Sequence, residues 1–497
     1  MVSTMSHAMT QGKPTNRAVL PPIRPAPTAH PDSPRQEHRQ TKRAHQRSRT
    51  AGIRDGICLA ASQGVGEQYF SAFALWLQAS PIQLGLLSAL PQVVGTWAQV
   101  ASTSRLSASY SKRALILFGT WAQACWWLPL GLLPLALPTD GAAMAFLLLV
   151  VVHATLGHLT VPAWNSLITD AVGPHLRGQY FGERARLMAL TSFAALGLGS
   201  VILQTARSWS LSGLGFVTLF VLAALARSGS AHALGALHEA PAAELSRPLT
   251  PLGAFLRKGG SPRFRRFVLY SALIHATTLM AGPYFVVYLL NHLHFSYMEY
   301  GAWMAAQVVG QFLSLKAWGR LGDRYGHLRV MRVTGYLVPV LPILYVFGSH
   351  WLFVVGVNLL AGVVWSGLSL AMGNYLFDTV APEEKASAVA ITSVVNALGW
   401  FSGAMVGGWL VGVLPDSVPF LGGEMALISN LPLLFVLSGC GRFLVGWSLL
   451  PLLRESRPVE PTSLDNFIGE LPVFRTLRRA LWRWRSKLPP PNSPSEA

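Results

Sequence analysis

Gln92-Val93-Val94-Gly95 recurs as Gln307-Val308-Val309-Gly310, 215 residues further along the chain. Other pairs repeat at the same offset, and after the third apolar segment the offset becomes 208. The further matches are Tyr69-Phe70 with Tyr284-Phe285, Arg105, Leu106 and Tyr110 with Arg320, Leu321 and Tyr325, and Asp170 and Pro174 with Asp378 and Pro382. Several matches in one register are not expected by chance, so we interpret the chain as a duplicated unit.

The composition is that of a membrane protein. Apolar residues make up 51% of the 497 residues and charged residues only 12%, about half of the roughly 25% found in soluble domains. The mean hydropathy is +0.40. These values exclude a water-soluble globular protein, a collagen and a disordered chain. We therefore expect an all-α polytopic membrane protein with twelve transmembrane helices in two pseudo-symmetric six-helix bundles.

Each expected span is close to the roughly 20 residues that cross a bilayer. The spans are 56–78, 83–103, 114–137, 142–168, 187–206, 211–235, 267–291, 298–318, 330–347, 351–377, 386–413 and 426–450. They define five parts of the chain. The parts are a disordered basic cytoplasmic tail (1–54), an N-terminal six-helix bundle (55–235), a cytoplasmic linker (236–266), a C-terminal six-helix bundle (267–453) and a cytoplasmic tail with a basic amphipathic helix (454–497).

Basic residues gather on one side of these spans. The loops on that side carry Arg105, Lys112, Arg113, Arg177, Arg184, Arg257, Lys258, Arg263, Arg265, Arg266, Arg320, Arg324 and Arg329, whereas the opposite loops carry Arg207. The positive-inside rule then predicts both termini in the cytoplasm, in a plasma membrane or a bacterial inner membrane. The net charge of +18 is explained by tails and loops beside the bilayer, so we expect no nucleic-acid partner. The basic helix expected in 454–497 suits an anionic leaflet or, alternatively, a protein partner.

One segment after the eighth span reads Gly319-Arg320-Leu321-Gly322-Asp323-Arg324-Tyr325-Gly326. Together with twelve spans and the repeat, it resembles the cytoplasmic loop signature of the major facilitator superfamily, over nearly all of residues 56–453. The resemblance implies that this loop latches the two bundles together, with Arg177, Arg184 or the start of the fifth span as partners. The alternative is a solvated loop that only sets topology.

The corresponding loop of the first half departs from this pattern, because Ala108 occupies the aspartate position. We expect Lys112 or Arg113 to pair with Glu383 or Glu384 in one state. The expected cytoplasmic gating residues are Gly319, Gly322, Asp323, Arg324, Gly326, Lys112, Arg113, Asp170, Arg177, Arg184, Asp378, Glu383 and Glu384.

Glu67 is the most informative single residue. It lies about eleven residues from either end of the first span, and a charged carboxylate at mid-bilayer costs roughly 2.5–3.5 kcal/mol on insertion scales. It is therefore expected to be protonated, paired or exposed to a water-filled cavity. Gln63 lies one turn earlier on the same helix face, and Tyr69 lies beside it. The functional interpretation is proton coupling or solute binding; the alternative is a structural carboxyl group bonded to neighbouring helices.

His153 lies at mid-depth in the fourth span and is expected to share a proton with Glu67, because histidine titrates near neutral pH. The alternative is a buried histidine whose hydrogen bonds serve only the packing of the helices. His158 is a weaker candidate, because five residues turn a helix by about 140° and the two histidines cannot face one cavity equally. In the second half the equivalent of Glu67 is Gly282. Polar and aromatic candidates there are His275, Tyr284, Tyr288, Asn358, Trp365 and Asn374.

Three further features carry no chemistry of their own. Gly399, Gly403 and Gly407 recur every fourth residue, a spacing that lets helix backbones approach closely. Arg442 is expected to extend to the cytoplasmic face. Cys58, Cys125 and Cys440 show no metal-binding or disulfide spacing.

The resemblance implies a secondary active transporter of a small solute that works by alternating access, with protons as a candidate coupling ion. We expect a monomer without cofactor, and no phosphate loop or catalytic set is present to indicate an enzyme. A non-transporting sensor or scaffold on the same fold, a passive facilitator and an efflux protein stay open as alternatives.

Overall fold

The computed structural model describes residues 34–102, 110–136, 139–172, 176–239, 260–381, 384–415, 417–420, 423–426 and 429–455. The chain divides into two compact units, Met1–Arg43 and Ala44–Ala497. In the first unit the described residues, 34–43, are helical. The second unit contains the remaining elements.

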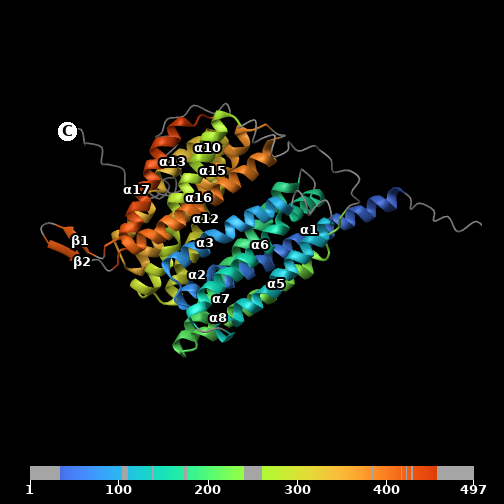
Figure 1. The fold of residues 1–497 in the computed structure, drawn as a ribbon. Helices are drawn as coiled ribbons and strands as arrows, with labels where there is room; N and C mark the ends of the chain where they lie inside the picture. The colour runs from blue at the N-terminus through green and yellow to red at the C-terminus, as the bar shows by residue number, and fades with distance from the viewer. Residues whose placement is uncertain are drawn as a thin grey trace, which may run out of the picture. The chain divides into compact units, whose positions relative to one another are not determined.

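In the described residues the first half contains six helical rods, which run from blue to green in Figure 1. Its elements are α1 (Pro34–Val65), the 3₁₀ turn η1 (Glu67–Tyr69), α2 (Phe70–Trp76), α3 (Pro81–Ala101), α5 (Lys112–Ala136), α6 (Thr139–Ala171), α7 (Arg177–Ser208) and α8 (Ser212–Leu234). The first rod consists of α1, η1 and α2 in succession.

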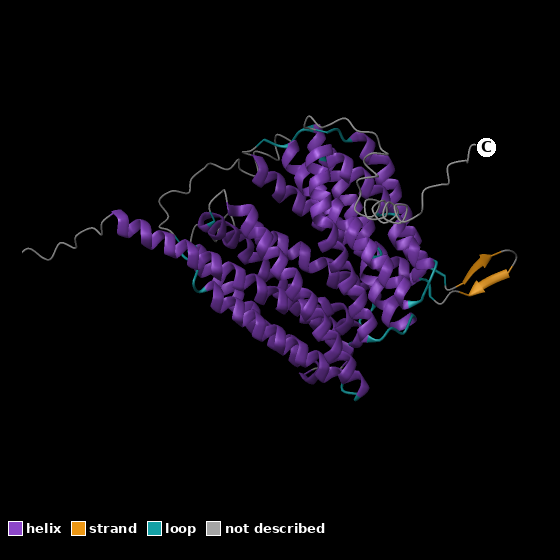
Figure 2. Ribbon diagram, turned by 180° about the vertical axis from the view of Figure 1, so that it is seen from behind, coloured by secondary structure: helices purple, strands orange, loops and turns teal. Residues whose placement is uncertain are grey.

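Among the described residues, six further rods form the second half. Its elements are α10 (Pro262–Leu279), the 3₁₀ turn η5 (Gly282–Tyr284), α11 (Phe285–Val287), the π-helical turn η6 (Tyr288–His292), α12 (Tyr297–Tyr325), α13 (His327–Leu337), α14 (Val340–Ile343), η7 (Leu344–Val346), α15 (Trp351–Thr379), α16 (Lys385–Val413), α17 (Leu431–Leu449) and η9 (Leu450–Leu452). A short antiparallel hairpin, β1 (Ser417–Phe420) and β2 (Gly423–Ala426), pairs Ser417 with Ala426 and stands beyond the helix ends (Figure 2).

Nine helices in the described part of the chain are long and apolar enough to cross a membrane. The rods outside this set are α1–α2, α3 and α12, and each carries polar side chains along its middle. These side chains are Gln63, Glu67 and Gln68 in the first rod, Gln92 in α3, and Gln307 and Gln311 in α12. A membrane helix that carries such groups usually turns them towards the bundle interior, so these three rods are the ones expected to line a polar cavity.

The two halves repeat the same local structure. Glu67–Tyr69 and Gly282–Tyr284 are both 3₁₀ turns and lie 215 residues apart. The N–H of Tyr69 donates to the carbonyl of Gly66, and the N–H of Tyr284 donates to that of Ala281. The second rod of each half also starts alike: Ser80 forms a capping box with Gln83 before α3, and Ser296 forms one with Glu299 before α12. The sequence register is therefore also a structural register.

A glutamate that follows the last rod of each half binds the start of the third rod. The carboxylate of Glu239 accepts from the main-chain N–H groups of Lys112 and Arg113, at 2.9 and 3.1 Å. The carboxylate of Glu455 accepts from the N–H of Leu328 at 3.0 Å, across the same separation of 127 residues. Because the first N–H groups of a helix have no partner within the helix, a carboxylate there satisfies them.

The glycine stripe of α16 packs against α10, as expected from its spacing. A Cβ atom at Gly399 would lie 2.5 Å from the carbonyl oxygen of Ala272, and one at Gly403 or Gly407 would overlap the next exposed carbonyls of α10. Gly412, further along the same helix, has nothing within 4 Å of that position. The stripe therefore allows backbone-to-backbone contact between the two helices.

The described structure corrects four expectations. Helix α1 begins at Pro34, so residues 34–54 are helical where a disordered tail was expected; the arginine, glutamine and alanine residues there favour a helix. The last span begins at Leu431, since the hairpin occupies the residues before it. The segment from Gly319 to Tyr325 belongs to α12 and is not a loop; the turn comes at Gly326, whose φ of +96° is accessible to glycine.

The fourth correction concerns Arg442. Its side chain is buried, and its Nη1 donates to the carbonyl of Val338 at 3.4 Å. It does not extend to the membrane face, because α17 turns this residue towards α13 and α14. The expected amphipathic helix in 454–497 lies outside the described residues beyond position 455.

The two halves touch where α3 and α12 begin and where α7 and α16 end. The hydroxyl of Tyr284 donates to the carbonyl of Pro81 at 3.0 Å, and the N–H of Tyr297 donates to Oε1 of Gln204 at 3.1 Å. A Cβ atom on Gly85 would lie 2.8 Å from the carbonyl of Ala404. The conformation is thus closed at this end, which we call the Tyr284 end.

Candidate functional site

Two cavities meet at the break in the first rod. One, of about 500 Å³, lies within the first half and is lined by residues of α1, η1, α3, α5, α6 and α8. The other, of about 420 Å³, lies between the halves and is lined by residues of η1, α2, α3, α7, η5, α11 and α12. Glu67, Gln68 and Ser88 line both. The rods with polar mid-sections therefore surround one polar region, as their composition indicated.

Glu67 is placed by the 3₁₀ turn, which interrupts the helix at this residue. Its side chain is 31% exposed, in the wall that the two cavities share. Oε2 accepts a hydrogen bond from Nε2 of Gln63 at 3.3 Å, and Oε1 lies 3.4 Å from Nε2 of His153. Gln63 and His153 therefore both contact the carboxylate of Glu67.

His153 lies against an aromatic wall. Its ring is 2% exposed and packs edge-on against Trp127 at 4.6 Å and Phe70 at 6.0 Å between centroids. Apolar surroundings of this kind strengthen every electrostatic interaction within them. His153 and Glu67 thus form a pair in which the histidine is buried and the acid faces open space. His158 lines the first-half cavity as well.

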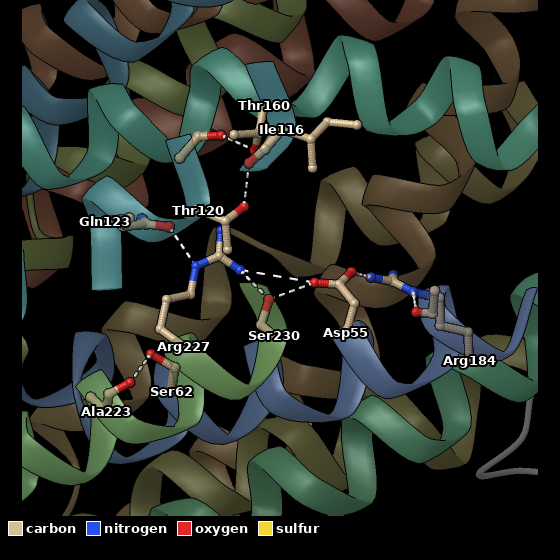
Figure 3. Close-up of polar contacts among 12 residues, drawn as sticks. Asp55, Ser62, Ile116, Thr120, Gln123, Thr160, Arg184, Ala223, Arg227 and Ser230 are labelled. Atoms are coloured by element: carbon tan, nitrogen blue, oxygen red, sulfur yellow. Dashed lines mark hydrogen bonds and ion pairs between the residues drawn. The ribbon is translucent and has the colours of Figure 1, made fainter. Parts of the chain in front are cut away.

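A chain of polar side chains continues from His153 into the first half. Nε2 of Gln123 lies 3.2 Å from Nε2 of His153 and donates to the carbonyl of His153 at 3.1 Å. Nε of Arg227 donates to Oε1 of Gln123 at 2.8 Å. Figure 3 shows the guanidinium of Arg227 lying between Gln123 on one side and Asp55 and Ser230 on the other.

The chain ends at an ion pair near the start of α7. Ser230 donates to Oδ1 of Asp55 at 2.7 Å and accepts from Nη1 of Arg227 at 2.9 Å. Nη2 of Arg184 donates to Oδ2 of Asp55 at 3.2 Å. Asp55 is 3% exposed and Arg227 is 5% exposed, so each needs the opposite charge of the other and the hydrogen bonds around it.

Sequence reasoning missed this chain. Arg227 stands in the apolar run Leu222-Ala223-Ala224-Leu225-Ala226 before Ser228, which is the same signal that identified Glu67. Asp55 lies at the boundary between the expected tail and the first span, so its burial could not be foreseen. Gln123 is an uncharged polar residue within a span, and such residues are common there. Arg227 could therefore have been found, whereas the other two could not.

In the second half the expected residues and the lining residues are different sets. The second cavity is lined there by Gly282, Pro283, Phe285, Val286, Tyr300, Trp303, Met304, Gln307, Val308 and Gln311. Of the expected candidates, Tyr284 closes the Tyr284 end and Tyr288 packs edge-on against Phe435. Nδ2 of Asn358 donates to the carbonyl of Trp303 at 2.6 Å.

The other expected residues also lie away from both cavities. His275 contacts the carbonyl of Ser271 and the ring of Trp400, while Trp365 and Asn374 on α15 line neither cavity. Tyr69 is fully buried, with its hydroxyl bonded to the carbonyl of Leu196 at 2.6 Å and to Ser200 at 2.8 Å. The rotation of a membrane helix about its axis follows from packing and not from the identity of its aromatic residues, and none of these four side chains lines either cavity.

The described gating residues make contacts within their own half. Lys112 binds Ser166 through Nζ at 2.9 Å, and Arg113 binds the carbonyl of Gly235. Arg177 donates to the carbonyls of Val172 and Thr169, and Arg184 binds Asp55.

On the second-half side, Arg324 lies over the Tyr325 ring and Asp378 lies 4.0 Å from His327. Gly319, Gly322 and Asp323 are in the last turns of α12, Gly326 ends it, and Glu384 precedes α16. Asp170 is exposed, and Glu383 lies outside the described residues. No group of three or more His, Cys, Asp or Glu side chains in the described ranges could hold a metal ion.

Comparisons with known proteins agree with this architecture. The family model of the Major Facilitator Superfamily matches residues 267–486. The comparison with curated proteins gives no match. Solved structures match the fold over most of the chain, and at identities this low the likeness concerns the fold alone.

Three of these structures are transporters by their titles. A variant of the nucleoside transporter NupG has a TM-score of 0.66 at 12% identity and covers 83% of this chain and 100% of its own. A bacterial homologue of the iron transporter ferroportin, in an inward-facing state, has a TM-score of 0.62 at 15% identity and covers 82% and 98%. A D-xylose-proton symporter has a TM-score of 0.60 at 12% identity and covers 84% and 99%.

The family model covers the second half, and the fold and the internal repeat extend the likeness to the first. The chain is a multi-pass membrane protein whose residues 267–486 match the Major Facilitator Superfamily model.

Proposed function

We propose that this chain is a secondary transporter that moves a small polar solute by alternating access, with Glu67 and His153 as the site of proton coupling. The observation that carries the proposal is the position of Glu67 in the wall shared by two cavities, 3.4 Å from a buried histidine. A group that couples a proton to a solute must contact both, and this acid faces the space between the halves.

The direction in which the site opens follows from the contacts between the halves. These contacts close the Tyr284 end, whereas the basic loops lie at the opposite end of the rods. With the basic loops in the cytoplasm, both termini are cytoplasmic and this conformation faces inward. As part of the same proposal, the protein acts as a monomer in a plasma membrane or a bacterial inner membrane.

The lining indicates an uncharged polar solute. Amide groups of Gln63, Gln68, Gln92, Gln307 and Gln311 surround the space together with Tyr300 and Trp303. Amides offer both donors and acceptors, and aromatic faces bind flat or ring-shaped solutes. Two structures with this fold are a nucleoside transporter and a D-xylose-proton symporter by title, so nucleosides and monosaccharides are the first solutes to examine.

The test uses purified protein in liposomes. A panel of nucleosides and monosaccharides is screened for an increase in thermal stability, since a ligand of the folded state raises it, and the best solute is followed in uptake driven by an inward proton gradient. We predict that Glu67→Gln abolishes uphill accumulation but keeps exchange of solute at equal pH, because only the protonation step is lost. Glu183→Gln, an exposed acid on α7, is the control. Uphill accumulation by Glu67→Gln would rule out this acid as the coupling site.

A sensor or scaffold on the same fold is distinguished without knowing the solute. Gln307→Cys is introduced into the second cavity after Cys58, Cys125 and Cys440 have been replaced by serine. A membrane-impermeant thiol reagent labels position 307 from both sides of the membrane if access alternates. Labelling from one side alone would favour the scaffold.

A further inference from the structure

The orientation of the Gln123 amide is fixed by its neighbour. Nε of Arg227 lies 2.8 Å from Oε1 of Gln123. Since a guanidinium group has donors and no acceptor, the oxygen of the amide must face Arg227. The NH₂ group of Gln123 is consequently turned towards His153, where it donates to the main-chain carbonyl at 3.1 Å and lies 3.2 Å from Nε2 of the ring.

This orientation matters for the proton between His153 and Glu67. If Nε2 of His153 carried a hydrogen, two donors would face each other across 3.2 Å. If Nε2 carries its single lone pair, Gln123 and Glu67 share it as donors, and the 3.4 Å contact with Oε1 of Glu67 is part of a hydrogen bond only when the carboxyl group holds the proton.

We infer that Gln123 is a positioning residue that, in this conformation, keeps Nε2 of His153 unprotonated and thereby places the shared proton on Glu67. The inference rests on the proposed function and adds to it the residue that decides where the proton lies. The neutral ring then carries its hydrogen on Nδ1, which is buried and has no hydrogen-bond partner among the described residues. The His153–Glu67 pair therefore carries the cost of an unpartnered buried N–H group, and a rearrangement of the Gln123 amide would remove that cost.

Charged and titratable groups lie on several of the elements around the pair. The charged or titratable groups around the pair are Asp55 and Glu67 from the first rod, His158 from α6 and Arg227 from α8, while α3 and α5 contribute the neutral Gln92 and Gln123. Arg227 is the positive group bonded to Gln123.

Arg227 also has an alternative partner, because its Nη1 lies 4.0 Å from Oδ1 of Asp55. If Arg227 moves fully to Asp55, the amide of Gln123 is free to turn and present its oxygen to His153. The proton then passes from the carboxyl oxygen of Glu67 to Nε2 of His153: the O–H bond breaks, the N–H bond forms, and the products are a carboxylate and an imidazolium. Asp55 also binds Arg184 of α7, so the proton position is linked to the helix that carries an expected gating residue.

The first test needs no solute and no change to Gln123. The full chain, labelled with ¹⁵N-histidine, is studied in lipid by solid-state NMR at neutral pH, and the His153 signals are assigned as those absent from the His153→Gln variant. Ile82→Cys and Gly408→Cys, cross-linked at the Tyr284 end, hold the conformation. A neutral ring with hydrogen on Nδ1 is the expected result. Hydrogen on Nε2, in a neutral ring or an imidazolium, overturns the inference.

The second test changes the amide itself. Gln123→Glu keeps the shape of the side chain but offers an acceptor to both Arg227 and His153. We expect the proton affinity of His153 in the same NMR titration to rise at least tenfold, to the point where the ring is an imidazolium at neutral pH. Gln92→Glu, which adds the same charge to the same cavity without a bond to His153, is the matched control.

An equal rise in both variants would mean that charge alone is responsible and would overturn the positioning role. Gln123→Asn, too short to reach both partners, provides a second variant if the glutamate variant does not fold, and it too is expected to raise the proton affinity of His153. Failure of the proposed function is seen separately, as uphill accumulation by Glu67→Gln, whatever the state of His153.

Discussion

Asp55 shows how a membrane helix accommodates a buried charge at the scale of one residue. Its two oxygens are divided between Ser230 and Arg184, and Arg227 lies beside them. Removing one member of such a group leaves the others buried without compensation, which typically costs about 3–5 kcal/mol. The first half therefore depends on this carboxylate for its stability.

We predict that Asp55→Ala lowers the free energy of unfolding by about 3–5 kcal/mol, measured by denaturation in mixed micelles. Asp170→Ala, an exposed acid on α6, is the control and is expected to change stability by less than about 0.5 kcal/mol. Equal effects of the two substitutions would show that the buried network contributes nothing specific.

At this scale the sequence can reveal an acid or base inside an apolar run, as it did for Glu67 but not for Arg227, whereas it does not show the direction in which uncharged side chains point. Glu67, Gln63 and His153 were predicted because a charge at mid-membrane must have a partner or a cavity. Tyr288 and Asn358 were predicted by residue type alone, and the structure buries both against their own half. Burial of an aromatic or amide group in a span is common and therefore says little about a site.

At the scale of single elements, the contact between α10 and α16 depends on the absence of side chains. The glycine stripe brings the backbone of α16 against the carbonyls of Ala272, Ala276 and Met280. Lipid offers no hydrophobic driving force for helix association, so close packing of this kind has to hold the pair together.

We predict that Gly403→Ala destabilises the protein by about 1–3 kcal/mol, the usual cost of overpacking, because the new methyl group would overlap the carbonyl of Ala276. Gly412→Ala in the same helix meets nothing within 4 Å and is the matched control. Thermal unfolding of the two variants side by side measures the difference. Equal melting temperatures would contradict the close contact.

The spacing of four predicted this contact, whereas the breaks in the rods were not predicted. Pro283 and Pro342 mark two of them, but the break at Gly66 contains no proline. No feature of the sequence predicted the 3₁₀ turn at Glu67, which is seen only in the structure. The hairpin of β1 and β2 was also missed, because its residues continue an apolar stretch into the expected last span.

At the scale of the whole molecule, the repeat and the count of spans were sufficient to predict two six-helix halves. The sequence could not predict which end is closed. The two halves match each other at both ends, and a transporter closes one end or the other depending on its conformation. The contacts of Tyr284 and Gln204 decide it in this structure.

We predict that Ile82→Cys and Gly408→Cys together form a disulfide on mild oxidation, in a background without native cysteines. An ideal Cβ at Gly408 lies 3.2 Å from Cα of Ile82, within reach of disulfide geometry. The cross-linked protein should lose transport and regain it on reduction, whereas each single variant should stay active under oxidation. Undiminished transport by the cross-linked form would show that the Tyr284 end need not open.

The paired 3₁₀ turns have a mechanical consequence. At the equivalent position of each half, a 3₁₀ turn interrupts the regular α-helical hydrogen bonding of the first rod. Each half can therefore bend at this turn with little further loss of backbone hydrogen bonds. The turn occurs in both halves of the repeat, but the acid occurs only in the first, because Gly282 occupies the position equivalent to Glu67. The two halves therefore share the same backbone break, but only the first break carries a carboxylate, so under the proposed function a change in protonation acts directly on the first half alone.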